Sequence, residues 1–115
     1  MAASEPAGTP YLYLTTVGRH SGLPRQIEIW FVAAEARFYL LAEHGQRAQW
    51  VKNITRNARV GVRVGSRTAP EFEAVARVLD RDRDAGAWER ARELFRQKYG
   101  WGDGLTVEIT PASVR

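Results

Sequence analysis

The chain has 115 residues, of which 44% are hydrophobic and 26% charged, and its formal net charge is +4. This length supports one domain with a modest core, the composition is ordinary for a soluble globular protein, and no run approaches the length of a membrane span. With no cysteine and only two histidines, disulfides and thiolate metal sites are excluded, and we expect no metal.

The N-terminal stretch 1–10 is small, polar and proline-bearing, so we predict a flexible lead-in, followed by a single domain over residues 11–115. This stretch lacks the basic and apolar segments of a signal peptide. Together with the missing cysteines, it favours a cytoplasmic protein without a membrane partner.

The positive charge favours anionic partners, and all but Lys52 and Lys98 of the 17 basic residues are arginine, which suits bidentate contacts to phosphate or carboxylate. Nucleic acid is one such partner, because small barrels bind single strands through aromatic side chains and basic grooves. The arginines are nevertheless dispersed and interrupted by acids, as in Asp80–Asp84. We therefore expect a small-molecule partner and no nucleic acid.

The N-terminal half predicts a meander of short strands. Tyr11–Val17 is an apolar, β-prone run, and Arg25–Ala34 alternates polar and apolar residues, with Trp30 on its polar face. A turn at Glu35–Arg37 leads to a third strand, Phe38–Ala42. Consecutive strands joined this closely pair antiparallel, which is how a Greek-key or split barrel begins.

The middle of the chain predicts a short helix followed by two more strands. The polar loop Glu43–Arg47 precedes a helix over Ala48–Arg56, and Asn57 near its end is expected in the left-handed conformation. Arg59–Val64 alternates valines with other residues, and Glu71–Leu79 alternates apolar with charged and mixed positions. Both patterns are typical of half-buried strands.

The C-terminal part predicts a longer helix and a closing strand. The charge run Asp80–Asp84 is expected to supply the N-cap of a helix over Ala85–Tyr99, which Gly100 ends. A final strand runs from Leu105 and stops at Pro111. The fold class is mainly β (α+β): a six-stranded antiparallel barrel with two helices, one of them packed at an end.

The turn between the first two strands holds two glycines, a proline and the basic residues Arg19, His20 and Arg25. Gly18 and Gly22 permit unusual backbone dihedrals and close approach of a ligand. Exposed amide groups beside arginines can hold a phosphate or carboxylate. A solvated hairpin tip explains the same residues, and the spacing alone leaves the two interpretations about even.

The motif Thr15-Thr16-x-Gly18-Arg19-x-Ser21-Gly22-x-Pro24-Arg25 resembles the signature hairpin of the deazaflavin-dependent nitroreductase family. The resemblance continues through Trp50-x-x-Asn53 and Asn57-x-Arg59-Val60, and loosely through Tyr99-Gly100-Trp101 to the last strand. It implies a split β-barrel related to the FMN-binding barrels and a bound deazaflavin, coenzyme F-420.

The resemblance also implies a coenzyme site. The turn that holds the phosphate and acidic tail corresponds to Arg19, His20, Ser21, Gly22 and Arg25. The strand along the ring corresponds to Gln26, Ile27, Glu28, Ile29 and Trp30, and the closing strand end and loop to Leu41, Ala42, Glu43 and His44. The contacting helix contributes Gln49, Trp50 and Asn53, and Tyr99 or Trp101 lies on the substrate side. By pattern alone, Trp30 and Trp50 are more simply explained as packing residues.

Three departures from the family weaken the choice of coenzyme more than that of fold. His20 stands where lysine is frequent, the loop after the third strand is shorter, and a long N-terminal helical region is missing.

No nucleophile–base pair is visible, which argues against a hydrolase and fits an enzyme whose cofactor carries the chemistry. Three functions stay open: an F-420-dependent quinone or nitroaromatic oxidoreductase, an FMN-dependent oxidoreductase, and a non-catalytic binder of a cofactor or acidic polymer. Arg19, Arg25 and Arg47 or Lys52 offer more charge than the single phosphate of FMN needs, which favours F-420. We expect a twofold homodimer that completes the pocket or core.

Overall fold

The computed structural model describes residues 9–112, which form seven strands, two α-helices and one short 3-10 helix. The strands are β1 (Tyr11–Val17), β2 (Pro24–Trp30), β3 (Val32–Ala34), β4 (Arg37–Ala42), β5 (Arg59–Val64), β6 (Phe72–Val78) and β7 (Leu105–Pro111). The helices are α1 (Gln49–Arg56) and α2 (Ala85–Tyr99), and the 3-10 helix is η1 (Gly45–Arg47). The predicted lead-in falls largely on residues 1–8, which lie outside the described residues.

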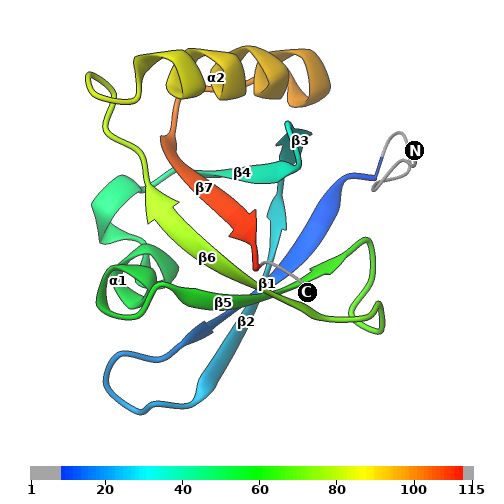
Figure 1. The fold of residues 1–115 in the computed structure, drawn as a ribbon, viewed down its shortest axis with the longest axis vertical. Coiled ribbons are helices and arrows are strands. Elements are labelled where there is room, and N and C mark those ends of the chain that lie inside the picture. Colours follow the sequence, from blue (N-terminus) through cyan, green and yellow to red (C-terminus); the bar gives the residue numbers. More distant parts are fainter. Residues whose placement is uncertain (1–8, 113–115) are drawn as a thin grey trace.

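All strand pairs are antiparallel, and the sheet order is β2-β1-β5-β6-β7-β4-β3. The sheet curls into a barrel whose two edges are formed by β2 and β3 (Figure 1). In Figure 1, α2 lies along the top, and the β1–β2 turn projects at the lower left, below α1. The expected mainly β split barrel with two helices is confirmed.

The number of strands was predicted wrongly, because Arg25–Ala34 is not one strand. It breaks at Phe31, and its two parts, β2 and β3, belong to opposite edges of the sheet. The Phe31 side chain is fully buried. Its N–H donates to the Tyr99 hydroxyl at 3.0 Å, and its carbonyl accepts from Lys98 Nζ at 3.0 Å. The end of α2 therefore satisfies the backbone groups that the break removes from the sheet.

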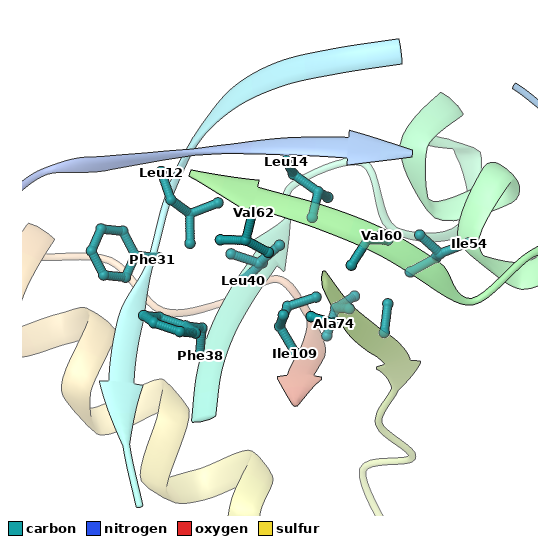
Figure 2. Close-up of a cluster of buried hydrophobic side chains, with 12 residues drawn as sticks. Leu12, Leu14, Phe31, Phe38, Leu40, Ile54, Val60, Val62, Ala74 and Ile109 are labelled. Atoms are coloured by element: carbon teal, nitrogen blue, oxygen red, sulfur yellow. The ribbon is translucent and has the colours of Figure 1, made fainter. Parts of the chain in front are cut away.

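The main hydrophobic core fills the inside of the barrel and draws on nearly every strand (Figure 2). Leu12, Leu14, Val62 and Leu40 are fully buried there, as the alternation of β1, β4 and β5 requires. From α1, only Ile54 reaches this cluster as a buried residue. The helix thus covers one end of the barrel beside β1 and β6.

A second core lies between α2 and the other face of β4. Tyr39 and Leu41 point to this side, where they meet Ala91 and Phe95 of α2. Both helix residues are buried. The strands β4 and β7 are therefore covered on both faces, whereas the outward-facing residues of β6, Glu73, Val75 and Arg77, are exposed.

Two predicted helix ends differ in the structure. Asn57, the C-cap of α1, is extended with φ −143° instead of left-handed, because the chain passes directly into β5. Asp84, the N-cap of α2, makes no side-chain capping bond. Its carboxylate instead accepts a hydrogen bond from the Asp80 N–H at 2.8 Å and forms an ion pair with Arg77. These two contacts stabilise residues 80–84 as a turn. Gly100 ends α2 in the left-handed conformation with φ 82°, as predicted.

Within residues 9–112, neither helix has the length and apolar character needed to cross a bilayer.

Candidate functional site

The turn between β1 and β2 is held by its own backbone. Gly18 N–H donates to the Leu23 carbonyl and Gly22 N–H to the Gly18 carbonyl, both at 2.8 Å. Gly22 has φ +75°, a conformation that other residues resist. Gly18 is required for space, since a Cβ there would lie 2.8 Å from Ser21 Oγ and 3.2 Å from the Leu23 carbonyl oxygen. Glycine is thus needed at position 22 for its backbone conformation and at position 18 for lack of space.

The turn is fastened to α1 through Arg19 and the buried amide of Asn53. Asn53 Oδ1 accepts from Arg19 N–H at 3.2 Å and from Arg19 Nη1 at 3.0 Å. Asn53 Nδ2 donates to the buried Thr16 hydroxyl at 3.0 Å, and Arg19 Nη2 donates to Gln49 Oε1 at 2.8 Å. Gln49 and Asn53 are four residues apart on one helix face, so both reach the same guanidinium.

The surface between this turn and α1 is positive, because no acidic residue lines the space between them and none lies nearby in the sequence. Neither residues 6–27 nor residues 44–70 contain an aspartate or a glutamate. Within the described part of the chain, the ion pairs involve Arg59, Arg77, Arg90, Arg92 and Arg96 and none of the basic residues of this surface. Those basic residues are Arg19, His20, Arg25, Arg47, Lys52 and Arg56. Within residues 9–112, the Arg19 guanidinium donates to the side-chain amide oxygens of Asn53 and Gln49 and to no carboxylate, so its charge is not neutralised there.

A first cavity of about 320 Å³ lies between the turn and α1. Its lining includes most of the residues predicted for the turn, all of those predicted for the helix and one predicted for the strand. They are Arg19, His20, Ser21 and Arg25 of the turn, Gln49, Trp50 and Asn53 of the helix, and Ile27 of the strand. Thr16 and Gly18 also line it and were not predicted as site residues. Both are part of the Thr-Thr-x-Gly motif, which was the available signal. The volume is in the range of small-ligand sites.

A second cavity of about 450 Å³ lies at the other end of β2. Its lining includes the predicted residues Glu28, Ile29, Trp30, Leu41, Glu43 and Trp101. Tyr11 and Phe95 also line it and were not predicted as site residues. Tyr11 pairs with Trp30 in the β1–β2 register, which explains why both reach this cavity.

Five predicted residues line neither cavity, and one of them is Tyr99. Gly22 shapes the turn, and Gln26 accepts a hydrogen bond from Arg67 Nη1 at 2.6 Å. Ala42 is buried opposite Leu105, and His44 is exposed before η1. The structure therefore divides the predicted set into two cavities along β2 and a few supporting or separate positions.

Tyr99, predicted on the substrate side, is engaged with the backbone at the β2–β3 break. Its hydroxyl accepts from Phe31 N–H at 3.0 Å and lies 2.7 Å from the Pro10 carbonyl oxygen and 2.9 Å from that of Phe31. Its ring stacks on Trp30, with centroids 4.3 Å apart and planes inclined by 7°. Trp30 is still 39% exposed, so this packing leaves part of the indole available to a ligand.

The family model of the F-420H(2)-dependent quinone reductases matches residues 3–109, which is nearly the whole chain. The chain belongs to this family. This F-420-dependent reductase is an oxidoreductase, and its cofactor is coenzyme F-420. No curated protein matches the sequence at a significant level.

Solved structures similar to this F-420-dependent reductase share its fold at low identity. The haem storage protein HutZ from Vibrio cholerae has a TM-score of 0.74 and 20% identity, with 92% of this chain and 84% of that chain covered. An F-420-H2-dependent reductase, FDR-A, has a TM-score of 0.62 and 23% identity, with coverages of 87% and 92%. A FAD-binding protein from Mesorhizobium loti has a TM-score of 0.69 and 13% identity, with coverages of 90% and 82%.

Proposed function

We propose that the reductase binds coenzyme F-420 along β2, with the phosphate and acidic tail at the β1–β2 turn, and reduces a quinone or nitroaromatic acceptor. The observation that carries this proposal is the meeting of an acid-free basic turn with two cavities on one strand. A phosphate and several carboxylates need more than one cation, and the turn and α1 supply several.

The residues present fit the coenzyme. Gly18 lines the first cavity and has no side chain, so a ligand there can approach its backbone. Arg25 lines that cavity and is exposed, and within the described residues its side chain bonds only to Ser21 Oγ, at 3.5 Å. A guanidinium held this loosely is available to an anion. Ile27 and Trp50 add apolar surface for a ring system.

In this proposal each side chain has a limited task. Arg25 holds the anionic groups, and Arg19 holds the turn against α1. Ile27 and Trp50 exclude water from the ring. The chemistry supplied by the reduced coenzyme when bound is a hydride transfer, and the acceptor takes the accompanying proton from solvent. The protein then needs no general acid, in keeping with a Tyr99 hydroxyl that is already bonded to the backbone.

The proposal is tested by titrating purified protein with F-420 and with FMN in a calorimeter. Arg25→Ala should weaken F-420 binding by about 1.5–3 kcal/mol, or about 10- to 150-fold, as for a hydrogen bond to a charged group. Binding should also weaken as salt rises. Arg81→Ala is the matched control, because Arg81 is exposed and lies in the Asp80–Asp84 turn away from both cavities. Unchanged affinity in Arg25→Ala, or tighter binding of FMN than of F-420, would contradict the proposal.

A further inference from the structure

The second cavity differs from the first in charge as well as in place. We propose that it is the acceptor site and that Glu28 and Glu43 make it select neutral or cationic planar aromatic acceptors over anionic ones. This inference rests on the proposed function for the reaction, and on the cavity's own geometry for the selectivity.

The walls of the second cavity suit a flat aromatic molecule. Four aromatic side chains line it: Tyr11 of β1, Trp30 of β2, Phe95 of α2, and Trp101 in the corner after α2. Tyr11 is 38% exposed and Trp30 is 39% exposed, an unusual degree for such large side chains. Aromatic side chains that stay accessible in a cavity favour stacking with another ring.

The charged side chains that line this cavity are Glu28 and Glu43, and within the described residues no basic side chain lines it. Glu28 Oε2 accepts from the Tyr13 hydroxyl at 2.7 Å, a neutral partner that leaves the carboxylate its charge. This hydrogen bond is also the main reason that the pKa of Tyr13 is raised, so Tyr13 stays neutral as well. Neither glutamate takes part in an ion pair within the described residues.

Two cations lie nearby, and both are engaged elsewhere. Lys98 Nζ donates to the Phe31 carbonyl and lies over the Phe31 ring, 4.0 Å from its centroid. Arg67 lies 4.7 Å from the centroid of the Tyr13 ring and donates to Gln26. Neither side chain lines the cavity, so a ligand there meets the two carboxylates and the aromatic rings first.

The strand β2 therefore runs from a positive cavity to a negative one. The first cavity is lined by Arg19, His20 and Arg25, and the second by Glu28 and Glu43. An anionic molecule is attracted to the first and repelled from the second. The acidic tail of the coenzyme and the acceptor are thus directed to different ends of the strand. A cation over an aromatic face gains further attraction from the ring.

The test uses coenzyme-free protein and three probes of similar size: benzyltrimethylammonium, benzyl alcohol and benzoate. Binding is followed by quenching of tryptophan fluorescence in a Trp50→Phe background, because Trp30 and Trp101 line this cavity and Trp50 lines the first one. We expect the cation to bind about tenfold or more tightly than benzoate, with the alcohol between them, and the difference to shrink as salt rises. Equal or tighter binding of benzoate, or no binding of any probe, would overturn the inference.

Substitutions then locate the selectivity. The double variant Glu28→Gln, Glu43→Gln keeps an acceptor for Tyr13 and should remove the preference for the cation. Glu73→Gln is the control, because Glu73 is an exposed strand residue outside this cavity. A preference that persists in a folded double variant would refute the role of the two glutamates. Probe binding needs no coenzyme, so failure of the Arg25 experiment leaves this test independent.

Discussion

Asn53 links the β1–β2 turn to α1 through hydrogen bonds, and replacing it tests whether these bonds position the turn. Asn53→Ala removes two hydrogen bonds accepted from Arg19 and one donated to Thr16. The bond to the guanidinium is worth about 1.5–3 kcal/mol and the other two about 0.5–1.5 kcal/mol each. Because water can replace the amide at the partly buried Arg19, we expect a net loss of about 3 kcal/mol. For this chain length the loss corresponds to a fall in Tm of about 12 °C.

The same variant should weaken F-420 binding about tenfold, because a turn released from α1 must be ordered again when the coenzyme binds. Gln49→Ala is the matched control, since it removes one exposed bond to the same guanidinium and should cost less than about 1 kcal/mol. The measurements are calorimetric melting and coenzyme titration of both variants. If Asn53→Ala melts within about 2 °C of the wild type and binds F-420 equally well, the argument that this amide positions the turn is refuted.

Three further predictions concern other parts of the molecule. Thr106 Oγ1 is buried and has no hydrogen-bond partner within the described residues. In a denaturant titration, Thr106→Val should therefore raise the free energy of unfolding by about 1 kcal/mol. A destabilised variant would show that the hydroxyl has a role. The pKa of Asp84 is held below its usual 3.8, first by the Asp80 N–H and then by Arg77, so its contribution to stability is present above about pH 4 and is lost as pH falls through the lowered value. In melting curves between pH 2 and 7, Asp84→Asn should lose less stability than the wild type as the pH falls below about 4. An unchanged decrease in Tm with falling pH would exclude Asp84 as its source. Sedimentation should give a homodimer at tens of micromolar, and a species of 13.0 kDa would count against it.

The strands that were predicted correctly are those whose alternation reports a single local environment. In β5, Val60 and Val62 face the barrel core, and their spacing alone indicates it. The break at Phe31 could not be predicted in this way, because residues 29–34 form a continuous apolar run that contains no glycine, proline or polar turn residue. What ends β2 is Tyr99, which is 68 residues away in the sequence.

In the candidate site, too, the features set by adjacent residues were predicted and those set by long-range contacts were not. The turn motif identified the residues of the first cavity, since its glycines and basic side chains are adjacent in sequence. The role of Arg19 was not evident, because its partners Asn53 and Gln49 lie on a helix whose orientation the sequence does not specify. Tyr11 and Phe95 reach the second cavity through strand register and helix docking, which are long-range properties.

The position of Phe31 has a mechanical consequence. The two edges of the sheet are β2 and β3, and a single residue joins them, so the barrel cannot open there without rotation about the backbone bonds of Phe31. The N–H of that residue is bonded to Tyr99 and its carbonyl to Lys98, both at the last turn of α2. Phe31 thus connects the two edge strands, and the end of α2 holds its backbone in place. The position of the two edges relative to each other is therefore tied to the end of α2, which lies on the opposite side of the molecule from the β1–β2 turn (Figure 1).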